Sequence, residues 1–109
     1  MSDLKTIITE IVKFRDARDW KQFHNSKDLS LAISIEAAEL NQLFLWKKAE
    51  EVNVGKLTEE LADILIFSIL LAHKHDLDIV EIISQKLKAN DLKYPVEKSK
   101  GTSKKYTEL

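Results

Sequence analysis

The sequence predicts an all-α fold, a small bundle of four helices. Apolar residues recur at a spacing of three or four over four long segments, which is the period of an amphipathic helix. No segment alternates between apolar and polar residues as a half-buried strand does. The 109 residues include only two glycines and one proline, so few residues interrupt the helices.

The first two helices are predicted over residues 3–18 and 26–48. An apolar stripe in the first supports it, and Ser2 is its candidate N-cap. A polar link, DWKQFHN, separates the two. Asn25 or Ser26 is the candidate N-cap of the second helix, because short polar side chains satisfy the free amides there.

The third helix is predicted over residues 54–75, and its middle is unusually apolar. The stretch ILIFSILLA, residues 64–72, is apolar nearly all round. A helix of this kind is buried on all sides. A small bundle rarely surrounds one of its helices so fully, so we expect the third helix to form an interface between copies of the chain.

The fourth helix is predicted over residues 78–92, with Asp78 as N-cap. Pro95 prevents its continuation, because proline lacks the amide that an inner helical turn needs. Residues 1–95 are therefore interpreted as one helical domain. Residues 96–109 are interpreted as a polar tail, a loop or partly disordered segment.

Composition and charge exclude several classes of protein. The chain has no cysteine, which excludes disulfides and thiolate-bound zinc. Its formal net charge of −1 gives no reason to expect nucleic acid or a membrane as partner. The longest apolar run is too short to cross a bilayer, and the N-terminus lacks the apolar core of a signal peptide. We expect a cytoplasmic protein.

Two pairs of acidic residues stand out within apolar surroundings. Glu36 and Glu39 lie three apart in the second helix, and Glu60 and Asp63 lie three apart in the third. Residues at this spacing are neighbours on one helix face. If the two helices pack antiparallel, all four carboxylates meet, and their repulsion is relieved by a divalent cation. Oxygen ligands alone favour Mg²⁺, or Mn²⁺.

Two other interpretations of these acids are open. A single Glu-x-x-Glu pair is most often a solvated face with lysine partners, although two pairs within apolar stretches make that less favourable. A carboxylate-bridged di-iron site is the other alternative. Such bundles carry Glu-x-x-His pairs, and none of His24, His73 and His75 has that spacing.

Three stretches together resemble the MazG-like nucleoside triphosphate pyrophosphohydrolases, and within them the dCTP pyrophosphatase branch. They are RDWKQFHNSKDLSLAISIEAAELNQLFLWK, EELADILIF and KLKANDLKYPVEKSKGTSKKYTEL, nearly everything after the first helix. The resemblance implies a MazG-like bundle that assembles as dimers or dimers of dimers. It also implies Mg²⁺-dependent hydrolysis of a (deoxy)nucleoside triphosphate, dCTP or a modified relative, to the monophosphate and pyrophosphate.

The resemblance assigns roles to individual residues. By position, the implied metal ligands are Glu36, Glu39, Glu60 and Asp63, and Glu39 is our candidate for activating water. The resemblance also implies residues that contact the substrate. They form the pocket walls, supply polar groups or belong to a closing segment that comes partly from a neighbouring subunit. These residues are Trp20, His24, Lys27, Trp46, Phe67, Asn90, Lys93 and Tyr94.

The chain departs from the family pattern at two positions. Ile35 stands where the wider family often has an additional Glu, which puts the number of metals in question. Phe67 stands where the dCTP branch often has Tyr, so the preferred base or sugar can differ. A helical module that binds nucleotide or metal without turnover is therefore an alternative function, and a purely structural bundle with solvated carboxylates is another.

Overall fold

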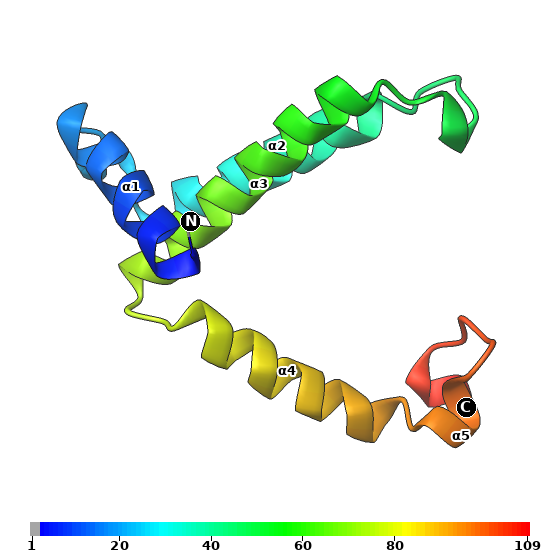
Figure 1. Ribbon diagram of the computed structural model, residues 1–109. Coiled ribbons are helices and arrows are strands. Elements are labelled where there is room, and N and C mark those ends of the chain that lie inside the picture. Colours follow the sequence, from blue (N-terminus) through cyan, green and yellow to red (C-terminus); the bar gives the residue numbers. More distant parts are fainter. Residues whose placement is uncertain (1–2) are drawn as a thin grey trace. The chain divides into compact units, whose positions relative to one another are not determined.

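The computed structural model describes residues 3–109, which are helical with no strand among them, as the sequence predicted (Figure 1). Three short 3₁₀ turns cover Lys21–Phe23, Ala49–Glu51 and Tyr106–Glu108. The α-helices of the described residues are α1 (Leu4–Ala17), α2 (Ser26–Gln42), α3 (Val54–Lys74), α4 (Ile79–Lys93) and α5 (Val96–Ser99).

The chain divides into two compact units, one ending at Asp76 and one covering Leu77–Leu109. The first unit holds α1, α2 and α3, and the second holds α4 and α5. The sequence placed α4 in one domain with the first three helices and treated only residues 96–109 as separate. In the structure, α4 and those residues fall in the same compact unit. The division into one helical domain and a tail stays a prediction.

Polar side chains cap the helices much as predicted. Ser2 lies outside the described residues, and Asp3 caps α1 by accepting a hydrogen bond of 2.8 Å from the Thr6 amide. Asn25 caps α2, and its Oδ1 accepts from the Asp28 amide. Each cap satisfies an amide that has no partner within its helix. The predicted starts of these helices are therefore correct to about one residue, as is usual for helix ends.

The α2 and α3 helices run antiparallel as a hairpin, and α1 packs near one end of it (Figure 1). The prediction that the second helix continues to residue 48 is wrong, because α2 ends at Gln42. Beyond it, the amides of Leu43 and Phe44 donate to the carbonyls three residues earlier. Trp46 then adopts a left-handed conformation with φ of 62°, which no α-helix accommodates.

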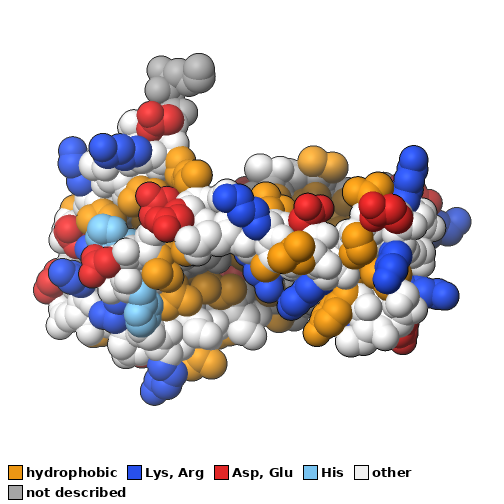
Figure 2. All heavy atoms as spheres, turned by 90° about the horizontal axis from the view of Figure 1, so that it is seen from below, with side chains coloured by type: hydrophobic (Ala, Val, Ile, Leu, Met, Phe, Trp, Pro, Cys, Tyr) orange, Lys and Arg blue, Asp and Glu red, His pale blue; other side chains and the backbone are white. Residues whose placement is uncertain are grey.

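Few side chains of a single chain are fully buried. Leu29 of α2 and Leu70 of α3 are 2% and 4% exposed and form the centre of the first unit. On the rest of α3, Leu61 and Leu65 are 47% and 54% exposed, so the all-round burial expected from the sequence is not reached within one chain. Figure 2 shows exposed hydrophobic side chains among the charged ones. None of the helices in residues 3–109 has the length and hydropathy needed to span a membrane.

In the second unit, α4 begins at the predicted cap, since Asp78 Oδ1 accepts from the Glu81 amide. The helix ends one residue after the predicted limit, before Pro95. The following residues contain α5 and a 3₁₀ turn, where the sequence suggested a loop or partial disorder. The ring of Tyr106 packs edge-on against Tyr94 with centroids 5.9 Å apart, which ties the tail to the end of α4.

Candidate functional site

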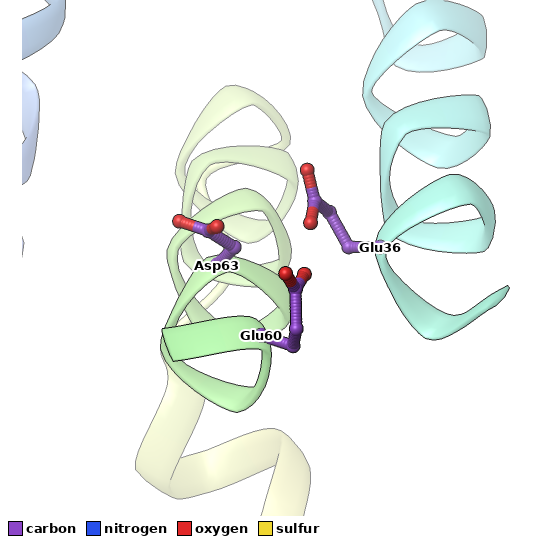
Figure 3. A group of neighbouring side chains, drawn as sticks. All are labelled: Glu36, Glu60 and Asp63. Carbon is purple, nitrogen blue, oxygen red and sulfur yellow. The ribbon is translucent and has the colours of Figure 1, made fainter. Parts of the chain in front are cut away.

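Carboxylates from α2 and α3 converge between the two helices. Glu36 points from α2 toward Glu60 and Asp63 on α3 (Figure 3). One carboxylate oxygen from each of the three residues lies within 4.8 Å of the other two. Glu60 and Asp63 share a face of α3 because they are three residues apart, and the antiparallel packing brings that face to α2. We call these three residues the acidic cluster.

Burial and repulsion change the protonation of this cluster. Burial first, and then the neighbouring carboxylates of Glu60 and Glu39, raise the pKa of Glu36 to about 7. The contact with Glu36 lowers the pKa of Glu60, but burial together with Glu39 and Asp63 outweighs it, so the pKa of Glu60 is raised as well. Without a cation, Glu36 therefore keeps its proton to a higher pH than an ordinary glutamate does.

Glu39 stands at the edge of the acidic cluster. Its side chain is exposed on α2, one turn after Glu36. Its charge raises the pKa of both Glu36 and Glu60, so it lies within interaction range of both. The structure thus brings all four predicted acidic residues into one region. Their individual roles stay predictions.

The donor set of the acidic cluster suits a divalent metal ion. Glu36 Oε2 and Glu60 Oε2 are buried and have no hydrogen-bond partner among residues 3–109. Within that range no lysine, arginine or histidine forms an ion pair with the cluster. Buried carboxylate oxygens without partners are costly, and a cation coordinated by them removes the cost. The cluster offers only oxygen donors, which hard divalent cations prefer.

A cavity of about 260 Å³ adjoins the acidic cluster, and Asp63 belongs to both. Most of its wall is apolar. Three residues that the sequence assigned to the substrate, Trp20, His24 and Phe67, line this cavity. Since Phe67 follows Asp63 by one turn of α3, helical spacing places the aromatic ring next to the carboxylates. We call this space the aromatic cavity.

The chain reversal after α1 positions Trp20. Asp19 has a left-handed backbone with φ of 55°, which turns the chain out of the helix. The amide of Trp20 then donates to the Arg15 carbonyl at 3.2 Å. Its ring meets the edge of Phe14 with centroids 5.8 Å apart, and the Arg18 guanidinium lies 3.6 Å from the Phe14 ring centroid. These contacts hold the indole at the cavity wall.

His24 and Lys27 differ in their surroundings. The His24 ring is half-buried, and its Nδ1 is buried without a hydrogen-bond partner among the described residues. Burial, and then the positive charge of Arg15, lower the pKa of His24, which favours a neutral ring. Lys27 is exposed in the first turn of α2 and does not line the aromatic cavity. Its predicted contact with substrate stays a prediction.

Trp46 does not meet Trp20 within one chain. The indole of Trp46 is 94% exposed and follows the end of α2. The segment between α2 and α3 lies at the end of the hairpin that is far from α1 (Figure 1). Trp20 follows α1 directly in the sequence and so belongs to the other end. A pocket that uses both rings would need a second copy of the chain.

The three remaining predicted residues belong to the second unit. Asn90 is half-buried on α4, and its carbonyl accepts from the Tyr94 amide at 2.8 Å. Lys93 Nζ lies 4.9 Å from the centroid of the Tyr106 ring, which also packs on Tyr94. Lys93 and Tyr94 therefore share an aromatic neighbour from the tail.

Sequence reasoning missed several cavity residues. Arg15 is 6% exposed and lines the aromatic cavity together with Ile11, Phe14 and Leu70. One signal was available, because Arg15 continues the apolar stripe of α1 at a spacing of four from Ile11. A charged side chain in phase with a buried stripe indicates a buried role.

Comparison with known proteins agrees with this geometry. A model of the MazG-like family matches residues 31–109. Over its whole length, the chain is 37% identical to dCTP pyrophosphatase 1 of Bos taurus and 34% identical to that of Homo sapiens. These alignments span all of this chain and about two thirds of each relative, 68% and 67%.

A solved structure is similar as well. The crystal structure of a pyrophosphatase from Archaeoglobus fulgidus matches with a TM-score of 0.82 and 32% sequence identity. The match covers 87% of this chain and 94% of that chain. The all-α architecture is therefore shared with a protein described as a pyrophosphatase.

Proposed function

The chain belongs to the MazG-like family, as its motifs indicated, and we propose that it hydrolyses dCTP or a modified deoxynucleoside triphosphate to the monophosphate and pyrophosphate. Relatives of this chain are dCTP pyrophosphatases, and a structural neighbour is a pyrophosphatase. The substrate partner is then a nucleotide, and the reaction class is hydrolysis of a phosphoric anhydride.

One observation carries the proposal: Asp63 belongs both to the acidic cluster and to the wall of the aromatic cavity. Phosphates need a cation, whereas a base needs an apolar and aromatic wall. Asp63 and Leu70 are the first and last residues of α3 that line the cavity, and seven residues span about 10 Å along a helix. That length allows a nucleotide to place its base between Trp20 and Phe67 while its phosphates lie at the cluster.

We propose Mg²⁺ as the ion, with Mn²⁺ as a substitute, held by the four carboxylates named above. When bound, such an ion offsets phosphate charge and makes water more acidic. The orphaned oxygens of Glu36 and Glu60 support this proposal, because they have no other partner among the described residues. Loading the ion requires Glu36 to release its proton, so metal affinity should rise with pH.

The remaining residues have supporting roles in this proposal. Glu39 is exposed at the edge of the cluster, where it can accept a proton from the attacking water. Trp20 and Phe67 wall in the base, and His24 faces it from the cavity wall. Lys93 is exposed, and it can contact a phosphate oxygen as a point charge.

We propose that the active form is a homodimer or homotetramer in the cytoplasm. The exposed apolar side chains of α3, such as Leu65 at 54%, support an interface between copies. Trp46 and the segment with Asn90, Lys93 and Tyr94 would then complete the site from a neighbouring copy. Light scattering coupled to size exclusion tests this arrangement, and a monomer at micromolar concentration with full activity would contradict it.

A panel of nucleotides tests the activity directly. Purified protein is incubated with each deoxynucleoside triphosphate and Mg²⁺, and monophosphate and pyrophosphate are quantified by ion-exchange chromatography. We expect both products in equal amounts, with dCTP or a modified dCTP turned over fastest. Release of orthophosphate and the nucleoside diphosphate would show that a different phosphoanhydride bond is cleaved. Binding of nucleotide without any product would support the non-catalytic module.

A further inference from the structure

A second cavity in the first unit is basic and lies beside the aromatic cavity. Its volume is about 180 Å³. The charged and titratable side chains that line it are Arg15, Lys21, His24, His73, Lys74 and Asp76. Five of these six side chains are basic types, and only one carries a carboxylate. We call this space the basic cavity.

Arg15 is the buried charge of the basic cavity. Its side chain is only 7% exposed, and its Nε and Nη2 both contact Oδ1 of Asp16, at 2.9 and 2.8 Å. No hydrogen bond from Nη1 is found among the described residues. A guanidinium presents five N–H donors in a planar fork, so the single oxygen of Asp16 leaves one edge of Arg15 available.

His24 supplies a second group without a partner. Its Nδ1 is buried and lacks a hydrogen bond within residues 3–109, and the ring lines the basic cavity together with Arg15. Buried polar atoms in native proteins nearly always have a partner, so an orphaned one indicates a missing ligand or water. As a neutral ring with one N–H, His24 can donate to an acceptor in the cavity.

We propose that the basic cavity is a metal-independent binding site for a small phosphate-like oxyanion. Arginine matches the paired oxygens of a phosphate with two parallel N–H donors, and Lys21 and Lys74 add point charges at the rim. The cavity volume equals the liquid share of roughly six waters. That space accepts a phosphate but no folded peptide segment, and the excess of basic groups opposes a metal ion.

The basic cavity is separate from the acidic cluster. Along α3, Asp63 precedes His73 by ten residues, or about 15 Å of helix. The cavity lining contains no member of the acidic cluster. Its shared wall with the aromatic cavity consists of Arg15, His24 and Leu70. An anion there would therefore fix the two polar groups that also border the proposed base position.

Phosphate titration in metal-free buffer tests this proposal independently of hydrolysis. The full chain is kept in excess chelator, which silences the acidic cluster, and inorganic phosphate is added with chloride at matched ionic strength as reference. Isothermal calorimetry and thermal unfolding are both recorded. We expect saturable heat and a saturable rise in melting temperature with phosphate. A rise that never saturates would be a general salt effect and would overturn the site.

Variants locate the bound phosphate. Arg15→Gln should abolish binding, and the rim variant His73→Gln/Lys74→Gln should weaken it roughly tenfold, since hydrogen bonds to charged groups are lost. Lys13→Gln, exposed on α1 outside the cavity, should keep wild-type affinity. If Arg15→Gln fails to fold, the rim variant decides, and unchanged affinity in it overturns the proposal.

Glu60→Gln separates this site from the proposed active site. This variant should lose nucleotide hydrolysis yet bind phosphate with wild-type affinity. Loss of phosphate binding in Glu60→Gln would mean that the anion occupies the acidic cluster, which would overturn the basic cavity as its site. Hydrolysis and phosphate binding can therefore fail separately.

Discussion

Two polar regions beside α3 treat charge in opposite ways. Near its first half, the acidic cluster gathers like charges that find no cation among residues 3–109. Near its second half, the buried Arg15 has an adjacent carboxylate, Asp16, at 2.8 Å. Burial first, and then the neighbouring carboxylates, raise the pKa of Glu36 to about 7 in the first region.

The contrast shows which of the two charge arrangements can be explained by the stability of the fold alone. A buried arginine with a carboxylate partner has its charge balanced, although one edge of its fork has no partner among the described residues. Carboxylates that repel one another lower the stability of the folded chain, so a ligand must compensate them. The acidic cluster therefore indicates a function more strongly than the basic cavity does.

The largest expected effect comes from breaking the acidic cluster. Glu60→Gln keeps the shape of the side chain but removes a charged donor for the metal. We expect the rate of nucleotide hydrolysis to fall roughly a hundredfold or more, since charge stabilisation in the transition state is lost. Because the substitution also relieves repulsion, the metal-free variant should melt at a higher temperature than the wild type. Steady-state kinetics and calorimetry measure the two effects.

Glu59→Gln is the matched control for this experiment. Glu59 is exposed on α3 next to Glu60 but lies outside the acidic cluster. It should keep wild-type hydrolysis and wild-type stability. Equal losses in the two variants would mean that acidic residues of this segment act through general charge, and the cluster would lose its special role.

The aromatic cavity should give the next largest effect. Trp20→Ala removes a ring that walls the cavity, and stacking on a base contributes about 1–3 kcal/mol. We therefore expect KM for the preferred nucleotide to rise roughly tenfold or more, with a smaller change in kcat. Phe23→Ala, which removes an exposed ring that does not line the cavity, is the control. A fall in kcat alone would contradict the assigned role.

Local sequence signals predicted most of the helices. Apolar periodicity and capping residues are local, so the helix starts and the caps Asn25 and Asp78 were correct. The convergence of the acidic residues was predicted from their spacing of three residues on each of two neighbouring helices. The family resemblance was confirmed by the match over residues 31–109. These features depend on contacts within one helix or between consecutive helices.

The features that sequence analysis missed depend on backbone strain or distant contacts. Trp46 ends the turn after α2 with a left-handed backbone, but no glycine or proline marks that position. The tail contacts the end of α4 through the rings of Tyr106 and Tyr94, which are twelve residues apart. No periodicity encodes these two arrangements. Arg15 is different, because its spacing of four from Ile11 placed it in the apolar stripe of α1 and the signal was overlooked.

A smaller effect should appear in the pH dependence of stability. The pKa of Glu36 is raised from 4.5 to about 7, so between these values the folded state binds a proton that the unfolded state has lost. Stability of the metal-free protein should therefore fall as pH rises through this window. The slope is at most about 1.4 kcal/mol per pH unit, and less here because water screens the half-exposed cluster.

The variant Glu36→Gln isolates this contribution. A neutral amide cannot titrate, so the difference in unfolding free energy between wild type and variant should change across the window. The lowered pKa of His24 has the opposite effect on stability, which it makes rise with pH. Because wild type and variant both contain His24, its contribution cancels in the difference. Denaturant unfolding at several pH values measures the difference. A difference independent of pH would mean that Glu36 does not hold the proton.

The smallest expected effect is a change of preference at Phe67. Phe67→Tyr adds the hydroxyl found in many members of the dCTP branch, one turn from Asp63 and in the wall of the aromatic cavity. The added group should alter the ratio of kcat/KM between dCTP and dTTP a few-fold, since one neutral hydrogen bond contributes about 1 kcal/mol. Overall folding should be unchanged, because the ring keeps its packing. Competition assays with both nucleotides in one reaction measure the ratio, and an unchanged ratio would place the base away from this part of the wall.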